Sequence, residues 1–371
     1  MTLLPLANLR QVVVVRTDHV GDLILSVPFL RALRQGAPRA RISLLVTPYT
    51  AGVLAGSPLV DDILSYDRRA PRPQRQAVVR QVRALQPELA VALAPRTRSY
   101  YLAWKSQAPW RVGYVYTNRP LSQLASRAWL THQLTMPIEE DLKAGLPVPH
   151  EIEQIGLLAH YLGLSYQDTH LELPVSEGDR QAGQKMRQSW GRHVVGLHLS
   201  NRWLSCGWRV ANLVRLVEGL VGATDGGGVI LTYGAAERDL AARLAESLAH
   251  VGLLGPGVAG AWPPHPRRAD PVPVRLAGNL TLGQWAGVLG ACSCVVTPDT
   301  GAVHVAAAMG RPVVVVYEPS TYRLCSQQWA PWGVPSRQLI KGHPMQTLSG
   351  ILRAVEELLG SALPVSGSGG R

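Results

Sequence analysis

Four residues in the last third of the chain have the types and spacing needed to hold an anion. Asp299, Thr300 and Gly301 follow a short apolar run and precede a series of Ala and Val residues, a pattern that predicts a strand, a tight turn and a helix. Thr300 is suited to the N-cap, and Gly301 lets a ligand approach the backbone. The N-terminus of a helix is a site where phosphate binds readily. His304 lies on the same helical face as Thr300, so it is placed to donate a hydrogen bond to an anionic oxygen there.

Two acids lie in a second junction near the start of the chain. The valines at 12–15 predict a buried parallel strand, and apolar residues spaced along 23–33 predict a helix after it. Asp18 lies in the connecting loop. Asp22 falls in the first turn of the helix, where the helix dipole favours an ionised carboxylate. One junction therefore carries acids, and the other is suited to an anion.

The segment 95–135 interleaves basic and aromatic side chains, and no acidic residue occurs from 89 to 138. Two interpretations stay open for this segment. It is either a wall that binds a sugar and phosphate through aromatic stacking and arginine, or an ordinary solvated helix surface with amphipathic arginines.

The two junctions, taken together with weaker motifs between them, resemble glycosyltransferase family 9, the group that includes the ADP-heptose lipopolysaccharide heptosyltransferases. The strongest matches are the strand, loop and helix of 12–33 and the Asp-Thr-Gly-x-x-His-x-Ala-Ala-Ala run of 299–308. Weaker matches are the Arg-Val-Gly-Tyr of 111–114, the loop 233–237 and the Pro-Trp-Gly of 331–333. The ordered set is more specific than any one motif.

This resemblance implies an α/β protein of GT-B architecture, with two Rossmann-like domains whose parallel sheets face each other across a cleft. The alternation of predicted strands and helices in both halves agrees with parallel sheets. We expect an acceptor-binding domain over 1–172, a nucleotide-sugar-binding domain over 180–345, and a segment 346–371 that holds a C-terminal helix packed back on the N-terminal domain and a flexible tail.

The resemblance also assigns roles to single residues. Asp22 matches the proposed catalytic base, and Asp18 in the same loop is the reserve candidate. The expected donor-binding residues are Asp299, Thr300, Gly301, His304, Glu237, Ser200, Arg202, Arg209 and Leu280. The expected acceptor-binding residues are Arg96, Arg98, Arg111 and Tyr114.

Two positions depart from the family pattern. Relatives usually carry a phosphate-contacting lysine where this chain has Cys206, so Arg202 or Arg209 is expected to supply the charge. Glu318 places a negative charge close to the expected phosphate site, which disfavours a highly charged donor pose unless its side chain points away.

The amino-acid composition limits the classes of partner that we expect the protein to bind. The 371 residues carry a net charge of +12, and only four of the 37 basic residues are lysines. Such a charge suits an anionic glycan, an anionic membrane surface or a nucleic acid, but no nucleic-acid-binding signature is present and we expect none to bind. No apolar run is long enough to span a membrane and no cleavable leader opens the chain, so we expect a cytoplasmic protein that touches the inner face of the membrane peripherally.

Metal chemistry has little support in the sequence. Cys292 and Cys294 form the only close cysteine pair, and no second pair completes a tetrahedral zinc site, so buried free thiols are the better interpretation. The chain also lacks an Asp-x-Asp. No metal and no cofactor is therefore expected beyond a nucleotide-sugar donor, for which the family suggests an ADP-linked sugar.

The predicted function is inverting, metal-independent transfer of a sugar, a heptose by the family's example, to a cell-envelope glycan or lipid-linked acceptor. Two alternatives remain: a nucleotide-sugar epimerase or hydrolase on the same fold, and a catalytically degenerate nucleotide-binding protein, which the missing lysine motivates.

Overall fold

The computed structural model describes residues 5–188, 190–191, 193–254 and 272–361. The chain divides into two compact units. The first comprises Met1–Pro174 and Arg323–Ala330, and the second comprises Val175–Tyr322 and Pro331–Arg371. The main break, between Pro174 and Val175, lies in the stretch that separates the two domains expected from the sequence.

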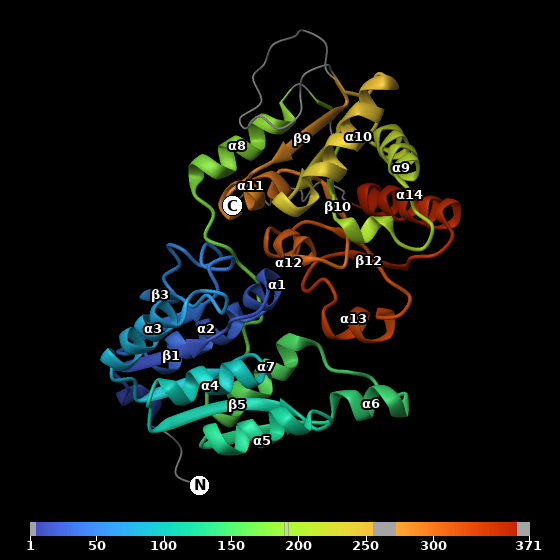
Figure 1. Ribbon diagram of the computed structural model, residues 1–371. Coiled ribbons are helices and arrows are strands. Elements are labelled where there is room, and N and C mark those ends of the chain that lie inside the picture. The colour runs from blue at the N-terminus through green and yellow to red at the C-terminus, as the bar shows by residue number, and fades with distance from the viewer. Residues whose placement is uncertain (1–4, 189, 192, 255–271, 362–371) are drawn as a thin grey trace, which may run out of the picture. The chain divides into compact units, whose positions relative to one another are not determined.

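The first unit is a six-stranded parallel sheet flanked by helices (Figure 1). Its strands are β1 (Gln11–Val15), β2 (Arg41–Val46), β3 (Asp62–Ser65), β4 (Leu89–Ala92), β5 (Trp110–Tyr116) and β6 (His132–Met136). Its helices are α1 (Val20–Ile24), α2 (Val27–Gly36), α3 (Arg72–Ala84), α4 (Thr97–Lys105), α5 (Pro120–Trp129), α6 (Ile138–Ala144) and α7 (Glu151–Tyr161), after a short 3₁₀ turn, η1 (Leu6–Asn8).

The strand order of this sheet is β3-β2-β1-β4-β5-β6, which is the doubly wound order of a Rossmann fold. The valine run of β1 is buried throughout because the strand lies in the middle of the sheet with helices on both faces. The strand order reverses between β1 and β4, and this reversal is the switch point of the sheet. The loops after these two strands therefore lie on either side of the crevice where such sheets bind ligands.

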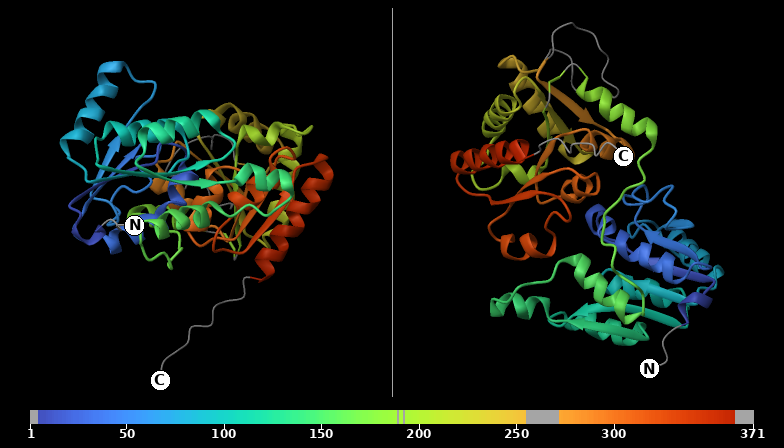
Figure 2. Two further views of the ribbon diagram at one scale, coloured as in Figure 1. Left: turned by 90° about the horizontal axis from the view of Figure 1, so that it is seen from below. Right: turned by 180° about the vertical axis from the view of Figure 1, so that it is seen from behind.

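Helices α3, α4 and α5 cover one face of the first sheet. Val82 of α3 and Leu102 of α4 pack on Val13 and Val15, whereas Tyr100 of α4 packs with α5 residues in a neighbouring cluster. Figure 2 shows these blue and teal helices on one side of the sheet and the green α7 on the other.

The second unit repeats the architecture with the order β12-β11-β10-β7-β8-β9, again parallel and with its reversal between β10 and β7. Its strands are β7 (Val194–His198), β8 (Gly228–Tyr233), β9 (Val274–Gly278), β10 (Cys294–Pro298), β11 (Val313–Tyr317) and β12 (Ser336–Ile340). Its helices are α8 (Glu177–Arg187), α9 (Val210–Ala223), α10 (Arg238–His250), α11 (Leu282–Gly290), α12 (Gly301–Ala308) and α14 (Pro344–Ser361), with the 3₁₀ turns η2 (Asn201–Leu204) and η3 (Ala235–Glu237).

The C-terminal helix, α14, is part of the second unit and of its core. That it also packs back on the N-terminal domain stays a prediction. Leu348, Ile351, Val355 and Leu358 form an apolar stripe at helical spacing and are buried in the same cluster as α9 and β10 residues. Burying each such side chain contributes roughly 1.5–3 kcal/mol, which holds the helix on this sheet. The expected flexible tail beyond 361 lies outside the described residues.

One correction concerns the expected continuity of 180–345. The segment Arg323–Ala330, which includes most of α13 (Tyr322–Gln328), belongs to the first unit. Polar contacts link this segment to the first unit. The amide of Gln328 donates to the hydroxyl of Tyr116 over 2.7 Å, and the ring of His150 contacts the carbonyl of Ala330 at 3.1 Å.

Candidate active site

Arg16 organises the polar cluster at the end of β1. It follows the strand directly, and its guanidinium is fully buried. Its Nη2 lies 3.0 Å from Glu151 Oε1 and 3.7 Å from Asp22 Oδ1, and its Nε lies 3.1 Å from Asp18 Oδ1. Its Nη1 also donates to the carbonyl of Leu93 after β4. The loops on both sides of the switch point are thereby tied to one cation.

Three carboxylates therefore share one guanidinium. Burial alone would lower the pKa of Arg16, but the facing charges of Asp18, Glu151 and Asp22 hold it well above the usual value. Burial raises the pKa of Asp18 to about 8, because the attraction of Arg16 offsets only part of the cost and the other two carboxylates add to it. Asp18 therefore keeps its proton to a higher pH than an ordinary aspartate does.

Asp22 has a more open position than its neighbour. It occupies the third position of α1 and accepts a hydrogen bond from the backbone amide of His19 over 3.2 Å. Its side chain is 17% exposed, against 6% for Asp18. Of the two acids predicted from the sequence, Asp22 is thus the more accessible to solvent.

Glu151, the first residue of α7, links the cluster to the core. It accepts from the hydroxyl of Tyr114 over 2.8 Å and from the amide of Gln328 over 3.2 Å. Tyr114 is fully buried, and burial raises its pKa well above the usual value, so it remains a phenol donor. This corrects the expectation that Tyr114 contacts an acceptor directly: it supports the carboxylate that holds Arg16.

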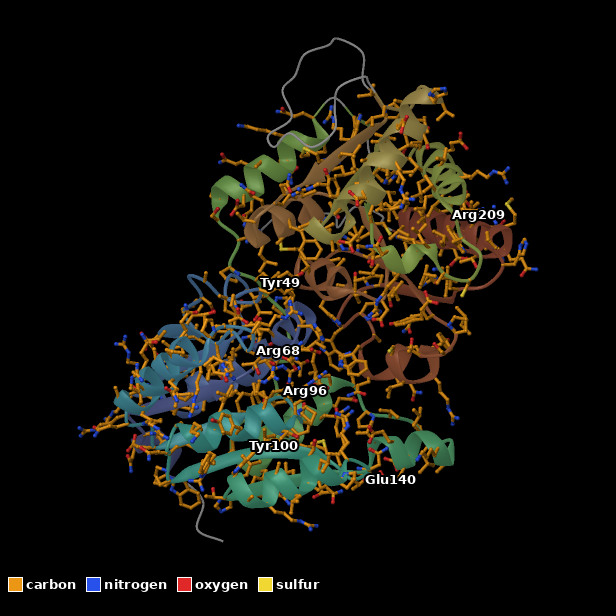
Figure 3. The ribbon with its side chains drawn as sticks, in the orientation of Figure 1. Tyr49, Arg68, Arg96, Tyr100, Glu140 and Arg209 are labelled. Carbon is orange, nitrogen blue, oxygen red and sulfur yellow. The ribbon has the colours of Figure 1, made fainter. Side chains whose placement is uncertain are left out.

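The arginines expected to bind an acceptor separate into two groups. Arg96 and Arg98 are exposed at the start of α4, directly after β4, and the charge of Arg96 acts on Asp18. Figure 3 labels Arg96 at this position. Arg111 lies instead near the beginning of β5, with its guanidinium bonded to the carbonyls of Trp129 and Ala108. The site lies at the edge of the sheet where the parallel strands end, whereas Arg111 lies near the edge where they begin. Arg111 is therefore not part of the site, which corrects the prediction.

The switch point of the second sheet brings most of the expected donor-binding residues together. Ser200 and Arg202 follow β7, and Asp299 and Thr300 follow β10. Arg202 Nη1 lies 3.2 Å from Asp299 Oδ2 and also donates to the Asp299 carbonyl. The Thr300 hydroxyl accepts from the amide of Ala302 over 3.3 Å, so Thr300 caps α12 as predicted.

Three further donor candidates lie around this centre. Glu237, at the end of η3, approaches Asn201 Nδ2 at 3.5 Å, which brings it to the loop after β7. Leu280 is half-buried just after β9, on the same edge of the sheet. His304 lies one turn into α12 and is 5% exposed, because this small-residue helix is buried on nearly all sides.

Lys341, at the end of β12, is a residue that the sequence analysis missed. It is 2% exposed, and its Nζ lies 2.5 Å from Ser205 Oγ and 3.3 Å from Glu318 Oε1, while also donating to the carbonyl of Arg202. Cys206 Sγ lies 3.6 Å from the other oxygen of Glu318. The carboxylate of Glu318 therefore points at a cation and two donors.

These contacts shift both partners of the pair. Burial lowers the pKa of Lys341, and the charge of Glu318 opposes the change only in part. Burial alone would raise the pKa of Glu318, but hydrogen bonds from Ser205 and Lys341 together with the lysine charge hold it below its usual value. Glu318 thus stays ionised and neutralised. Arg209, expected as one substitute for the missing lysine, is the exposed N-cap residue of α9 (Figure 3).

The two neighbouring cysteines of the second sheet, Cys292 and Cys294, are buried and unreactive. Burial raises the pKa of Cys292 and of Cys294 to about 12, which keeps both as thiols. Over the residues that the structure describes, no group of three His, Cys, Asp or Glu side chains is arranged to hold a metal ion.

Two parallel sheets in doubly wound order, each with charged side chains at its switch point, define an α/β protein with a GT-B-like fold. A family model described as glycosyltransferase family 9 (heptosyltransferase) matches residues 75–347, so the chain belongs to glycosyltransferase family 9 and is a glycosyltransferase.

Known proteins share this fold over nearly the whole chain. The structure of a family 9 glycosyl transferase from Veillonella parvula superposes with a TM-score of 0.74 at 19% identity and covers 97% of this chain and 99% of that one. The E. coli ADP-heptose lipopolysaccharide heptosyltransferase II gives 0.71 at 19% identity, with 95% and 99% covered. A lipopolysaccharide core heptosyltransferase of Haemophilus influenzae is 18% identical over 313 residues, which cover 83% of this chain and 79% of that protein.

These findings confirm the predicted family, the GT-B-like fold and the enzyme class. Within the described part of the chain, no helix combines the length and the apolar character that crossing a bilayer requires.

Proposed function

We propose that this enzyme transfers a heptose or a closely related sugar from a nucleoside diphosphate donor to an anionic cell-envelope glycan, with inversion at the anomeric carbon and without a metal ion. The donor and acceptor classes are supported by the family and by the relatives, whose names specify ADP-heptose in one case and the lipopolysaccharide core in another.

The placement of Asp22 is the observation that carries the mechanism. In this proposal Asp22 takes the proton from an acceptor hydroxyl while that oxygen attacks the anomeric carbon. The bond from the anomeric carbon to the diphosphate oxygen breaks, and the diphosphate leaves with the electron pair. Arg16 lies 3.7 Å from Asp22 and 3.1 Å from Asp18, and so holds both acids of this loop.

The second unit supplies the groups that stabilise the leaving diphosphate. The N-terminus of α12 lies at the switch point, directly after β10, and Arg202 is the cation beside it. Because Arg202 is paired with Asp299, a diphosphate that binds here replaces the carboxylate as its partner. Glu318 is neutralised by Lys341 and does not oppose this.

The acceptor side of the proposal rests on the exposed arginines after β4. Arg96 and Arg98 extend from the start of α4 next to the loop that holds Asp18 and Asp22. Arginine binds phosphate and carboxylate groups through two parallel hydrogen bonds, which suits an acceptor that carries such groups close to its reactive hydroxyl.

The test is Asp22→Asn, which removes the base and keeps the shape of the side chain. Turnover on a lipopolysaccharide-core acceptor should fall by roughly 10²–10⁴-fold, the range of general-base loss. ADP affinity should stay unchanged, since Asp22 belongs to the other unit. Asp67→Asn, at an exposed acid in the loop after β3, is the matched control. Near-normal turnover of the Asp22→Asn variant would assign the base elsewhere, and release of free sugar without an acceptor would favour a hydrolase.

A further inference from the structure

The helical layer α3-α4-α5 carries a second concentration of charge, away from the loops that hold Asp22. These three helices contain no acidic residue. A pocket of about 410 Å³ lies between α3 and α4, and five of its lining side chains are cationic. The cationic residues are Arg72, Arg75, Arg80, Arg83 and Lys105.

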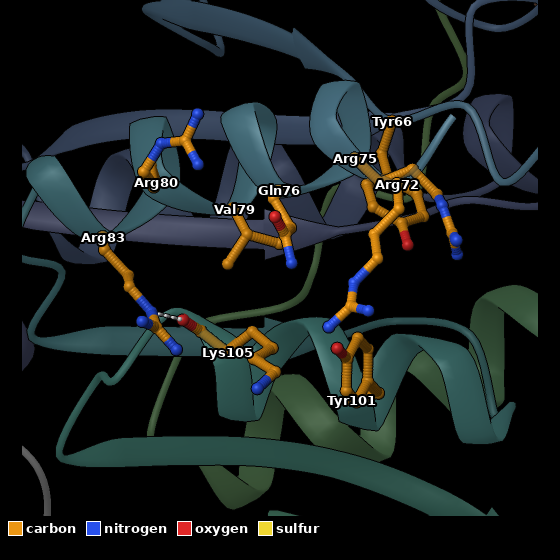
Figure 4. A pocket seen from close by; sticks show the side chains of 9 residues that line it. All are labelled: Tyr66, Arg72, Arg75, Gln76, Val79, Arg80, Arg83, Tyr101 and Lys105. Atoms are coloured by element: carbon orange, nitrogen blue, oxygen red, sulfur yellow. Dashed lines mark hydrogen bonds between the residues drawn. The ribbon is translucent and has the colours of Figure 1, made fainter. Parts of the chain in front are cut away.

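The pocket also has an aromatic and apolar part. Tyr66 and Tyr101 line it beside Gln76 and Val79 (Figure 4). Figure 4 shows the α3 side chains on one side of the space and Tyr101 and Lys105 of α4 on the other. At one end Arg83 donates to the carbonyl of Lys105 over 2.9 Å, which fixes the spacing of the two helices.

The charges in this pocket are not balanced by acids. Within the described residues, none of the five cations forms an ion pair, and the Nε of Arg75 is buried without a hydrogen-bond partner. Clustered cations repel one another, and a buried N–H without a partner costs free energy. An anion with several oxygen acceptors would relieve both costs.

An aromatic cluster continues directly from the pocket. Tyr101 and Trp104 of α4 contact Trp129 of α5, with ring centroids 5.5 Å and 6.1 Å away. Lys105 Nζ lies 4.2 Å from the centre of the Trp104 ring. Tyr101 and Lys105 therefore belong to both features, so the basic pocket and the aromatic cluster form one continuous surface.

Exposed apolar side chains accompany this surface. Trp104 is 40% exposed, and Leu121 and Leu124 of α5 are 79% and 67% exposed. Leu121 and Leu124 are three residues apart and lie on one face of the helix. Tryptophan and tyrosine favour the membrane–water interface, and arginine and lysine beside them are attracted to anionic lipids.

We propose that the outer face of α3, α4 and α5 docks on an anionic phospholipid bilayer, and that the pocket between α3 and α4 holds a lipid phosphate headgroup. Charge complementarity selects this occupant: the face offers cations without acids, together with exposed indole and leucine side chains suited to the headgroup region. The inference goes beyond the sugar transfer proposed above, because vesicle binding can be measured without any turnover.

The experiment is co-sedimentation of the full-length protein with vesicles of phosphatidylcholine and phosphatidylglycerol, compared with phosphatidylcholine alone. The variant Arg72→Gln/Arg75→Gln/Arg80→Gln removes three pocket cations. Each cation near an anionic surface contributes about a fivefold factor in partitioning, so the triple variant should bind roughly 100-fold more weakly. Unchanged far-UV circular dichroism and unfolding temperature would show that it folds.

The matched control is Arg215→Gln/Arg243→Gln/Arg353→Gln, which makes the same charge change on exposed helix positions of the second unit. It should bind anionic vesicles nearly as well as the unmodified protein. Equal losses in both triple variants would overturn the proposal, since binding would then reflect net charge alone. Unchanged binding of the pocket variant would overturn it as well.

Two further changes separate the parts of the surface. Lys105→Gln, a milder variant, should weaken anionic-vesicle binding about fivefold. Trp104→Ser should weaken the binding that survives at about 1 M salt, where the Debye length is only about 3 Å. Tight binding of a soluble oligosaccharide phosphate to this pocket without vesicle binding would replace the membrane with a soluble polyanion and refute the proposal.

Discussion

Replacing Arg16 by Met tests the electrostatic account of the first cluster most directly. The guanidinium is fully buried and faces Asp18, Asp22 and Glu151 within 3.7 Å. Methionine keeps much of the length and apolar volume of arginine and removes the charge. The change leaves the carboxylates without their cation, and it also removes the bond to the carbonyl of Leu93.

The magnitude follows from the burial of the cluster. Removing one partner from a buried ion pair costs about 3–5 kcal/mol, because an uncompensated charge stays behind. Without Arg16 the carboxylates hold protons in the folded state at pH values where the unfolded chain has released them. The unfolded state then binds fewer protons, so stability falls as the pH rises from about 4 to 8. The loss relative to the unmodified protein should therefore be larger at pH 8 than at pH 5.

Urea unfolding followed by circular dichroism at both pH values measures the effect. Arg31→Met is the control, since Arg31 pairs with Asp168 and Glu172, whose side chains are 57% and 49% exposed. Exposed pairs of this kind contribute about 0–1 kcal/mol. An Arg16→Met loss that matches the control, or one that does not depend on pH, would refute the reasoning.

Three other changes test single contacts. Because burial raises the pKa of Asp18 to about 8, the unmodified protein should lose stability as the pH rises from about 4 to 8, by at most about 1.4 kcal/mol per pH unit. Asp18→Asn should flatten this slope in thermal unfolding. An unchanged slope would contradict the assignment. Lys341→Met leaves Glu318 without its cation and should weaken ADP binding roughly tenfold in calorimetric titration, whereas Lys341→Met/Glu318→Gln should recover part of the loss. Arg202→Ala should weaken ADP binding roughly ten- to hundredfold and Arg209→Ala much less; equal effects, or none, would remove Arg202 from the anion site.

Local sequence patterns predicted the junctions of the site well. The valines of β1 are uninterrupted because that strand is buried on both faces, and the turn that follows must begin a helix, which places Asp22 in its first turn. The cap at Thr300 follows in the same way, since hydroxyl side chains at that position satisfy a free amide of α12. Arg16 carried a usable signal too, as the charged residue that ends the valine run.

Other residues of the site gave no such signal. Tyr114 and Arg111 lie in one motif and one strand, yet Tyr114 reaches Glu151 in the buried cluster while Arg111 binds carbonyls near the opposite end of β5. The sequence showed the motif that contains both residues. It did not show which end of the strand each residue lies near, because that depends on where the strand begins.

The sequence by itself determined the alternation of strands and helices, the doubly wound class, and the acids and caps that sit within a few residues of a strand end. Only the tertiary structure decided which distant groups share a charge. Arg16 meets Glu151 across 135 residues, and Lys341 meets Ser205 across 136. The physical reason is that parallel strands end at one edge of a sheet in an order set by crossovers. Neighbours there come from packing, which local periodicity does not encode.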